Sequence, residues 1–287
     1  MINISYCYIK MFFNVQKKDE NTHIVSGKEV TKDDYVKLSN DASLFDHSTY
    51  FNSIDNFFNV DSTKIKLFVD ELALSTQIVI KQSKMLYLHG YLLYFSLSQY
   101  LKQNPLVDFV NIIETGTARG FSSICMAKAL HDNKRDGKIY TIDVLPNNKK
   151  MFWNCVEDFT GEKTRPELLK KWNHLLEYIE FIQGDSKQIL NDLHQKYFVP
   201  RVHFSFLDAQ HTYSYLKHEM NWVKQRQEKG DVIVCDDYTT YHTGRQQYPG
   251  IIRAVDEFVE ENKYNQNIFY GDDGDKERGY VHLVKND

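Results

Sequence analysis

The sequence has few cysteines, no strong excess of either charge and no long apolar run. Its four cysteines, Cys7, Cys125, Cys155 and Cys235, stand far apart and form no CxxC pair, so neither a disulfide framework nor a zinc finger is expected. The net charge of −4 gives no overall electrostatic reason to expect a nucleic acid or a membrane surface as a partner. We therefore predict a cytoplasmic protein that binds neither.

Two apolar stretches are poor candidates for targeting or membrane segments. The start of the chain, MINISYCYIKMFF, lacks a basic region and interrupts its apolar residues with polar ones, so we do not expect a signal peptide. Residues 85–101 form the most apolar window, but this window is short for a membrane span and contains His89, Ser96 and Gln99. We predict a buried or interface helix there.

The composition and the periodicity of the sequence change near residue 80. Residues 1–80 are polar and rich in aromatic side chains, with a helical pattern only over 62–82, and we expect them to form a cap or an oligomerisation extension. Strand-like and helix-like segments alternate over residues 81–287. With 42% hydrophobic residues, the 287-residue chain can bury one large core.

Five short runs rich in Val, Ile, Phe and Tyr are separated by segments long enough for crossover helices. The runs cover residues 110–116, 138–143, 179–185, 202–208 and 231–237, and helical patterns cover 122–130, 214–228 and 251–262. Two final runs, 265–271 and 278–285, flank the turn-like DDGDKE and predict an antiparallel hairpin. The pattern predicts a doubly wound α/β fold with a mostly parallel, Rossmann-like seven-stranded sheet and helices on both faces.

Each of the five runs ends in or near an acidic residue. The acids are Glu114, Asp143, Asp185, Asp208 and the pair Asp236 and Asp237. Parallel strands place their carboxyl ends on one rim, where ligands bind in open sheets. So many carboxylates repel one another unless cations or hydroxyl donors lie between them, so we interpret the rim as a binding site. The alternative is that Asp simply favours strand ends and helix caps.

The loop after the first run, ETGTARG, is a candidate ligand loop. Gly116 permits a tight turn, and Gly120 lets the next helix begin close to a ligand whose charge faces backbone N–H groups. The loop is neither a P-loop nor a GxGxxG motif, because Ala118 replaces the second glycine. Asp143, at the end of the next strand, is placed to accept hydrogen bonds from ribose hydroxyls.

On the motifs IIETGTARGFSS, IYTIDV, IQGDS, FLDAQHTY and VIVCDDY, residues 87–284 resemble the class I S-adenosylmethionine-dependent methyltransferases. The resemblance is greatest to the metal-dependent macrolide-sugar O-methyltransferase and cephalosporin-hydroxylase-like group. It implies that residues 81–287 form the S-adenosylmethionine-binding domain. The cofactor contacts that it implies are Glu114, Gly116, Thr117, Gly120, Ser122, Asp143, Asp185, Ser186 and Asp208.

The same resemblance implies a magnesium ion held by Asp208, Asp236 and Asp237, with His211 as the catalytic base. Carboxylate oxygens suit a hard divalent cation, which lowers the pKa of a bound hydroxyl. His211 would then take the proton, and the alkoxide would attack the sulfonium methyl group. The implied partner is a small-molecule hydroxyl acceptor, such as a saccharide or secondary-metabolite diol, and we expect a homo-oligomer.

Several assignments have alternatives. His211 could instead orient the helix that begins near residue 214, and one of Asp236 and Asp237 could cap a turn. We interpret His203, inside an apolar run, as a hydrogen-bonded core residue, and the loop with His242 and Arg245 as a substrate-contacting segment. For the whole chain, the alternatives are a nicotinamide-dependent oxidoreductase, against which the missing GxGxxG argues, and a non-catalytic cofactor-binding module.

Overall fold

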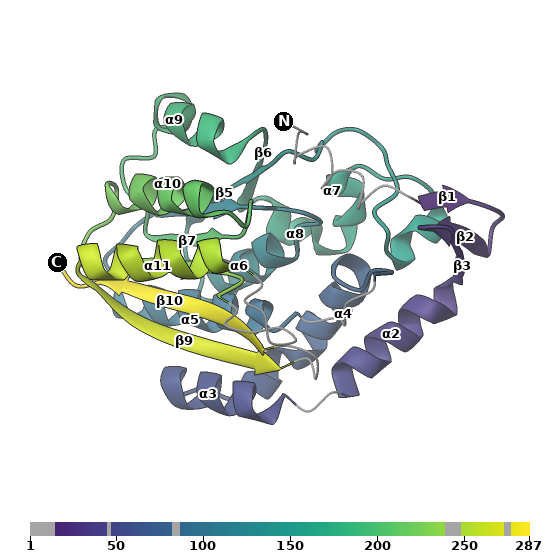
Figure 1. Cartoon of the computed structure of the whole chain (residues 1–287), viewed down its shortest axis with the longest axis horizontal. Coiled ribbons are helices and arrows are strands. Elements are labelled where there is room, and N and C mark those ends of the chain that lie inside the picture. Colours follow the sequence, from purple (N-terminus) through teal and green to yellow (C-terminus); the bar gives the residue numbers. More distant parts are fainter. Residues whose placement is uncertain (1–14, 45–46, 82–86, 239–247, 273–276) are drawn as a thin grey trace.

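The computed structural model describes residues 15–44, 47–81, 87–238, 248–272 and 277–287, whose helices and strands are shown in Figure 1. None of the helices in these ranges is long and apolar enough to cross a membrane. Cys7, His242 and Arg245 lie outside the described residues. The other three cysteines are buried free thiols.

One seven-stranded sheet forms the centre of the molecule. Its spatial order is β6 (Ile179–Gln183), β5 (Gly137–Asp143), β4 (Val110–Thr115), β7 (Phe204–Leu207), β8 (Val232–Cys235), β10 (Glu277–Lys285) and β9 (Tyr264–Asp272). The first five strands in this order pair in parallel, whereas β10 is antiparallel to both β8 and β9. The predicted fold class, including the terminal hairpin, is confirmed.

Helices cover both faces of the sheet because neighbouring residues of a strand point to opposite sides. Ile112 of β4 belongs to one buried cluster and Ile113 to the other. The first cluster includes α5 (His89–Gln103) and α6 (Phe121–Asp132), and the second includes α9 (Ser186–Tyr197), α10 (Tyr213–Lys224) and α11 (Pro249–Glu261), which lie together in Figure 1. Most residues of α5 are buried, as predicted for this segment.

The N-terminal part contains a small sheet and several helices. The antiparallel strands β1 (Val15–Lys17), β2 (Thr22–Val25) and β3 (Lys28–Thr31) precede α2 (Lys32–Leu44), α3 (Ser48–Phe58), the 3-10 turn η1 (Ser62–Ile65) and α4 (Lys66–Thr76). Buried residues of this part, such as Tyr50 and Leu72, belong to the same apolar cluster as Phe206 of β7 and Tyr280 of β10. The N-terminal part and the large sheet therefore share one core.

The connection between β5 and β6 is long and carries its own small core. It contains η2 (Val156–Thr160), α7 (Arg165–Leu168), η3 (Lys170–Trp172) and α8 (Asn173–Leu176). A separate buried cluster inside it includes Leu145, Trp153 and Leu168. Asn154 fastens this insertion to the N-terminal part, because its side-chain oxygen accepts hydrogen bonds from the Tyr35 hydroxyl at 3.0 Å and the Ile80 amide at 3.1 Å.

Two predicted helices end earlier in the structure than expected. The helix predicted over 62–82 stops at Thr76, because Ile80 is instead paired with Asn154. The helix predicted over 214–228 stops at Lys224, because the carbonyl of Arg226 accepts a hydrogen bond from the Val202 amide at the start of the β7 segment. In both cases a tertiary contact determines the helix end.

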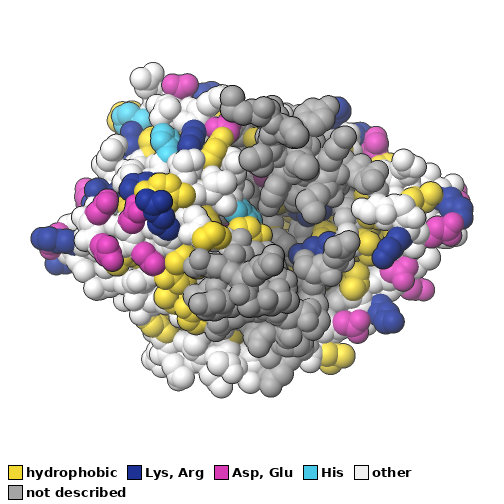
Figure 2. All heavy atoms as spheres, viewed as in Figure 1, with side chains coloured by type: hydrophobic (Ala, Val, Ile, Leu, Met, Phe, Trp, Pro, Cys, Tyr) yellow, Lys and Arg dark blue, Asp and Glu magenta, His cyan; other side chains and the backbone are white. Residues whose placement is uncertain are grey.

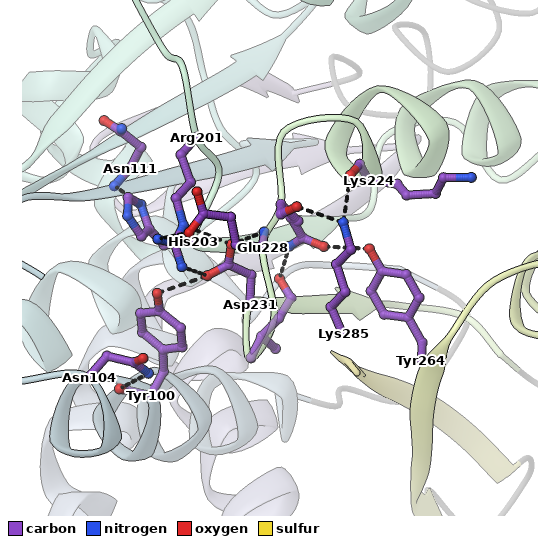
Figure 3. A network of polar contacts seen from close by, with 12 residues as sticks. Tyr100, Asn104, Asn111, Arg201, His203, Lys224, Glu228, Asp231, Tyr264 and Lys285 are labelled. Atoms are coloured by element: carbon purple, nitrogen blue, oxygen red, sulfur yellow. Dashed lines mark hydrogen bonds and ion pairs between the residues drawn. The ribbon is translucent and has the colours of Figure 1, made fainter. Parts of the chain in front are cut away.

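A buried polar network ties the amino ends of the strands together (Figure 3). The Asp231 carboxylate is completely buried and accepts hydrogen bonds from the Tyr100 hydroxyl at 2.9 Å and from Arg201 at 2.9 and 3.0 Å. His203 Nδ1 accepts a hydrogen bond from the Asn111 amide at 3.0 Å, which confirms the interpretation of His203 as a hydrogen-bonded core residue. These groups lie at the end of the sheet opposite the acidic rim.

Candidate active site

The parallel register brings the strand-end acids to one rim. Thr115 of β4 pairs with Leu207 of β7, and Leu207 pairs with Cys235 of β8. Asp208 and Asp236 follow these paired residues directly, and backbone hydrogen bonds continue for one step beyond the strands, from Asp208 N to Thr115 O and from Asp236 N to Leu207 O. The positions of the acids along the rim therefore follow from strand pairing.

Asp208, His211 and Asp237 form a compact group on this rim. His211 Nδ1 lies 2.5 Å from Asp237 Oδ2, and His211 Nε2 lies 3.3 Å from Asp208 Oδ1. One ligand atom from each residue lies within 4.8 Å of the others. Asp237 has a left-handed backbone, with φ of 58°, which redirects its side chain at the strand end. The imidazole is thus held between two carboxylates.

Asp236, the other acid predicted as a metal ligand, lies outside the compact group. Its side chain is buried and accepts the Asp237 amide at 2.7 Å, and it is not a member of the compact group of Asp208, His211 and Asp237. Burial, together with the charges of Asp208 and Asp237, raises the pKa of Asp236 well above its ordinary value. The compact group in the structure thus consists of Asp208, Asp237 and His211, and the role of Asp236 as a metal ligand stays a prediction.

Arg278 supplies a positive charge to this acidic region. Burial disfavours its charged form, but Tyr280, Asp237, Asp236 and Asp208 more than compensate and raise the pKa of the guanidinium. For Asp208, burial raises the pKa of the carboxyl and His211 opposes that rise. The raised pKa values of Asp208 and Asp236 indicate that Arg278 does not fully offset the cost of burying these carboxyl groups, so the region can accommodate further positive charge.

The loop between β4 and α6 packs directly against the acidic group. Gly116 has φ of +92°, and a Cβ atom there would lie 2.1 Å from the Asp208 carbonyl oxygen. Gly120, with φ of +89°, precedes α6 and lies against Leu169 of the insertion. Ala118 adopts the left-handed backbone, with φ of 45°, although it replaces the glycine of the usual motif. Its amide donates to Asp143 Oδ2 at 2.6 Å.

Several of the residues predicted to contact the cofactor are engaged in hydrogen bonds with their own chain. Glu114 is completely buried and accepts the hydroxyl groups of Ser122 and Ser123, and Thr117 is 2.5 Å from the Thr141 hydroxyl. Asp143 accepts the Ala118 and Leu145 amides, so both of its oxygens help to shape the loop. These side chains are therefore positioned by hydrogen bonds within the chain.

Asp185 and Ser186, predicted for the adenine side, also have structural partners. Asp185 caps α9 by accepting the Lys187 amide at 3.0 Å, and it accepts the Tyr215 hydroxyl at 2.7 Å. The Ser186 hydroxyl donates to Glu219 at 2.6 Å. The alternative role of an acid as a helix cap is therefore realised at Asp185.

Glu219 is a residue of this region that the sequence analysis missed. It is buried on α10, accepts the Thr115 hydroxyl at 3.0 Å and lines a small pocket together with Asp208, His211 and Ile251. Burial raises the pKa of Glu219 to about 7. A signal was present in the sequence, because Glu219 lies on the same helical face as the apolar Leu216, Met220 and Val223.

Comparison with known proteins gives two kinds of match. Residues 113–238 match the model of a family described as a methyltransferase domain. No match was found among curated proteins. The O-methyltransferase TomG from Streptomyces achromogenes, involved in tomaymycin synthesis and solved in complex with SAM, has a TM-score of 0.54 at 16% identity, over 80% of this chain and 96% of its own. An O-methyltransferase from Bacillus cereus in complex with SAH has a TM-score of 0.51 at 14% identity, over 89% of this chain and 100% of its own.

Proposed function

We propose that this chain, a methyltransferase by the match of residues 113–238, moves the methyl group of S-adenosylmethionine to a hydroxyl group of a small molecule. The finer proposal is a metal-dependent reaction on a saccharide or another diol, as in the macrolide-sugar group that the motifs resemble. The enzyme class follows from the family match. The assignments of an oxygen acceptor and of a metal ion are based on the geometry of the rim.

The contact between Gly116 and Asp208 is the observation that carries the proposal. The glycine loop that would hold a cofactor lies against the backbone of the first acid of the compact group, where only a glycine fits. A sulfonium donor bound at this loop would therefore have its methyl group next to the group of Asp208, His211 and Asp237. Transfer between bound partners depends mainly on such positioning.

The donor set of this group fits a divalent cation. Asp208 and Asp237 offer carboxylate oxygens, and one oxygen from each lies within 4.8 Å of the other and of a His211 ring nitrogen. Carboxylates suit Mg²⁺ and Mn²⁺, which leaves the imidazole free for proton transfer. A bound cation would supply charge that stabilises the deprotonated hydroxyl of the acceptor.

His211 is the proposed general base. Its Nδ1 is 2.5 Å from Asp237, so the tautomer assigned from this geometry carries the proton on Nδ1 and donates it to the carboxylate. Nε2, on the Asp208 side, is then the nitrogen that accepts a proton from the acceptor hydroxyl. Asp237 orients the ring and stabilises the imidazolium that forms.

The proposed acceptor is a small molecule. TomG, which shares the fold, takes part in the synthesis of tomaymycin. On the face shown in Figure 2, basic and acidic side chains of the described residues are interspersed, an arrangement that does not favour a polyanion. We further propose that residues 1–80 cover the acceptor or form a subunit interface, and that the enzyme is a cytoplasmic homo-oligomer.

Calorimetry on purified protein tests both parts of this proposal. The wild type should bind S-adenosylhomocysteine and should bind Mn²⁺ in a separate titration. The Asp208→Asn variant should bind S-adenosylhomocysteine as the wild type does. It should lose most of its Mn²⁺ binding, because one of two ligating carboxylates becomes neutral. The same substitution at the exposed Asp192 of α9 should change neither. Absence of S-adenosylhomocysteine binding by the wild type would refute the methyl-donor assignment, and Mn²⁺ binding unaffected by Asp208→Asn would refute the metal site.

A further inference from the structure

Arg165 is a buried arginine in the insertion between β5 and β6. Its side chain is only 1% exposed, and its Nε donates to the Ala118 carbonyl oxygen at 2.9 Å. The guanidinium carbon lies 5.5 Å from the centre of the Trp153 ring and 5.6 Å from that of Phe181. The arginine is therefore fixed between two aromatic rings and attached to the glycine loop.

Among the described residues, much of the hydrogen-bonding capacity of the Arg165 guanidinium is unused. A guanidinium has five N–H donors, and the buried Nη2 of Arg165 has no partner within the part of the chain that the structure describes. The side-chain Oδ1 of Asn147 is also buried and lacks a partner there. The two residues are neighbours, because the Arg165 amide donates to the Asn147 carbonyl oxygen at 3.1 Å. Buried polar atoms without partners are rare and call for an explanation.

A simple ion pair with Asp143 does not account for Arg165. Between these two described residues there is neither a hydrogen bond nor an ion pair. The two oxygens of Asp143 instead accept the Ala118 amide at 2.6 Å and the Leu145 amide at 2.7 Å. Arg165 is close enough for its charge to oppose the effect of burial, which raises the pKa of Asp143. The arginine thus lies beside the carboxylate at the end of β5 without being bonded to it.

The insertion that carries Arg165 is firmly held. Thr164 caps the short helix α7 by accepting the Glu167 amide at 3.3 Å, and Glu167 in return accepts the Thr164 amide at 2.8 Å. Asn154 fastens the other side of the insertion to Tyr35 and Ile80. The position of the guanidinium is therefore fixed before any ligand binds.

We propose that Arg165 and Asn147 form part of the binding site for the nucleoside of the methyl donor. Arg165 Nη2 would donate to an acceptor atom of the ribose or the purine, and Asn147 Oδ1 would accept one of their donors. The carboxyl ends of β4 and β5 and the glycine loop are where an open parallel sheet binds a nucleotide-like ligand. This inference rests on the proposed use of S-adenosylmethionine, and it adds a recognition role for the insertion.

Titration calorimetry with two ligands tests the assignment. S-adenosylhomocysteine contains the nucleoside and the amino acid, whereas 5′-methylthioadenosine lacks the amino acid. Arg165→Met should weaken both ligands by a similar factor, about tenfold to a hundredfold, because a hydrogen bond from a charged donor to the shared nucleoside is lost. Asn147→Ala should weaken both by a smaller factor.

The matched control is Arg226→Met. Arg226 also stacks on a tryptophan, with its guanidinium carbon 3.8 Å from the centre of the Trp222 ring, and it also donates to a backbone carbonyl, that of Trp222 at 3.0 Å. It lies at the opposite end of the sheet, so this substitution should leave both affinities unchanged. Thermal unfolding of each variant shows whether it is folded.

The outcomes separate this inference from the proposed function. If the wild type binds no S-adenosylhomocysteine, the methyl-donor assignment fails and this inference fails with it. If the wild type binds it and Arg165→Met binds both ligands as tightly as Arg226→Met, only the role of Arg165 is overturned. Where Arg165→Met does not fold, Arg165→Lys and Asn147→Ala decide, and unchanged affinities in both would overturn the inference.

Discussion

Glu219 should make the stability of the protein fall as the pH rises, and the variant Glu219→Gln should remove this effect. The glutamate is buried on α10, and burial raises the pKa of its carboxyl from 4.5 to about 7. The folded state therefore holds the proton more tightly than the unfolded state. The stabilising contribution is fully present below pH 4.5 and is lost as the pH rises through 7.

The size of the effect follows from the two pKa values. Between pH 5 and pH 8, the free energy of unfolding of the wild type should fall by about 2–3 kcal/mol relative to that of Glu219→Gln, since each pKa unit corresponds to about 1.4 kcal/mol. For a chain of this size, whose unfolding entropy is about 0.6 kcal/mol/K, that difference is roughly 3–5 °C in Tm. Glutamine has nearly the same shape and can still bond to the hydroxyl groups of Thr115 and Ser186, so the packing is conserved.

Scanning calorimetry at several pH values between 5 and 8 measures the difference directly. The Tm of the wild type should fall relative to that of Glu219→Gln from about pH 5 onward, with most of the change complete near pH 7 to 8. Glu260→Gln, at an exposed position of α11, is the matched control for removing a carboxylate and should follow the wild type. Parallel curves for wild type and Glu219→Gln would refute the reasoning, because the buried carboxyl would then not change its affinity for protons on folding.

Two further substitutions test the ends of the sheet. Asp231→Ala should lower the free energy of unfolding in urea by about 3 kcal/mol, because it leaves Arg201 without its buried carboxylate, and S-adenosylhomocysteine binding should persist; a loss below 1 kcal/mol would contradict this. Gly116→Ala should weaken S-adenosylhomocysteine binding at least tenfold, because the new Cβ would meet the Asp208 carbonyl oxygen. Gly230→Ala, with a similar φ of +87° and open space around it, should keep wild-type affinity, and equal affinities in the two variants would count against the contact.

The fold could be predicted because local patterns dominate in this part of the chain. The strands β4, β5, β7 and β8 are short apolar runs buried on both faces, and each is followed by turn or loop residues. The methyltransferase class, predicted from the same strand-end motifs, is confirmed by the family match over residues 113–238. Helix ends were less predictable, because the end of α4 depends on Asn154, which is 74 residues beyond Ile80.

The site could be predicted only in part. Strand pairing brings Asp208, His211 and Asp237 together, and this could be anticipated from the positions of the acids after parallel strands. The sequence does not reveal the left-handed backbone of Asp237, and adjacent residues at a strand end point in different directions. Which of Asp236 and Asp237 lies against His211 therefore could not be predicted. Arg165 was missed because its partners lie in the loop at Ala118 and on β6.

The core shared by the N-terminal part and the large sheet has a consequence for how the protein unfolds. Tyr50 of α3 and Tyr280 of β10 have ring centres 6.0 Å apart, and both side chains are buried. Removing residues 1–80 would expose the apolar side of α5 and β10 to water, at a cost that scales with the uncovered area. Heat or urea should therefore melt both parts in a single cooperative transition, although the composition of the chain changes near residue 80.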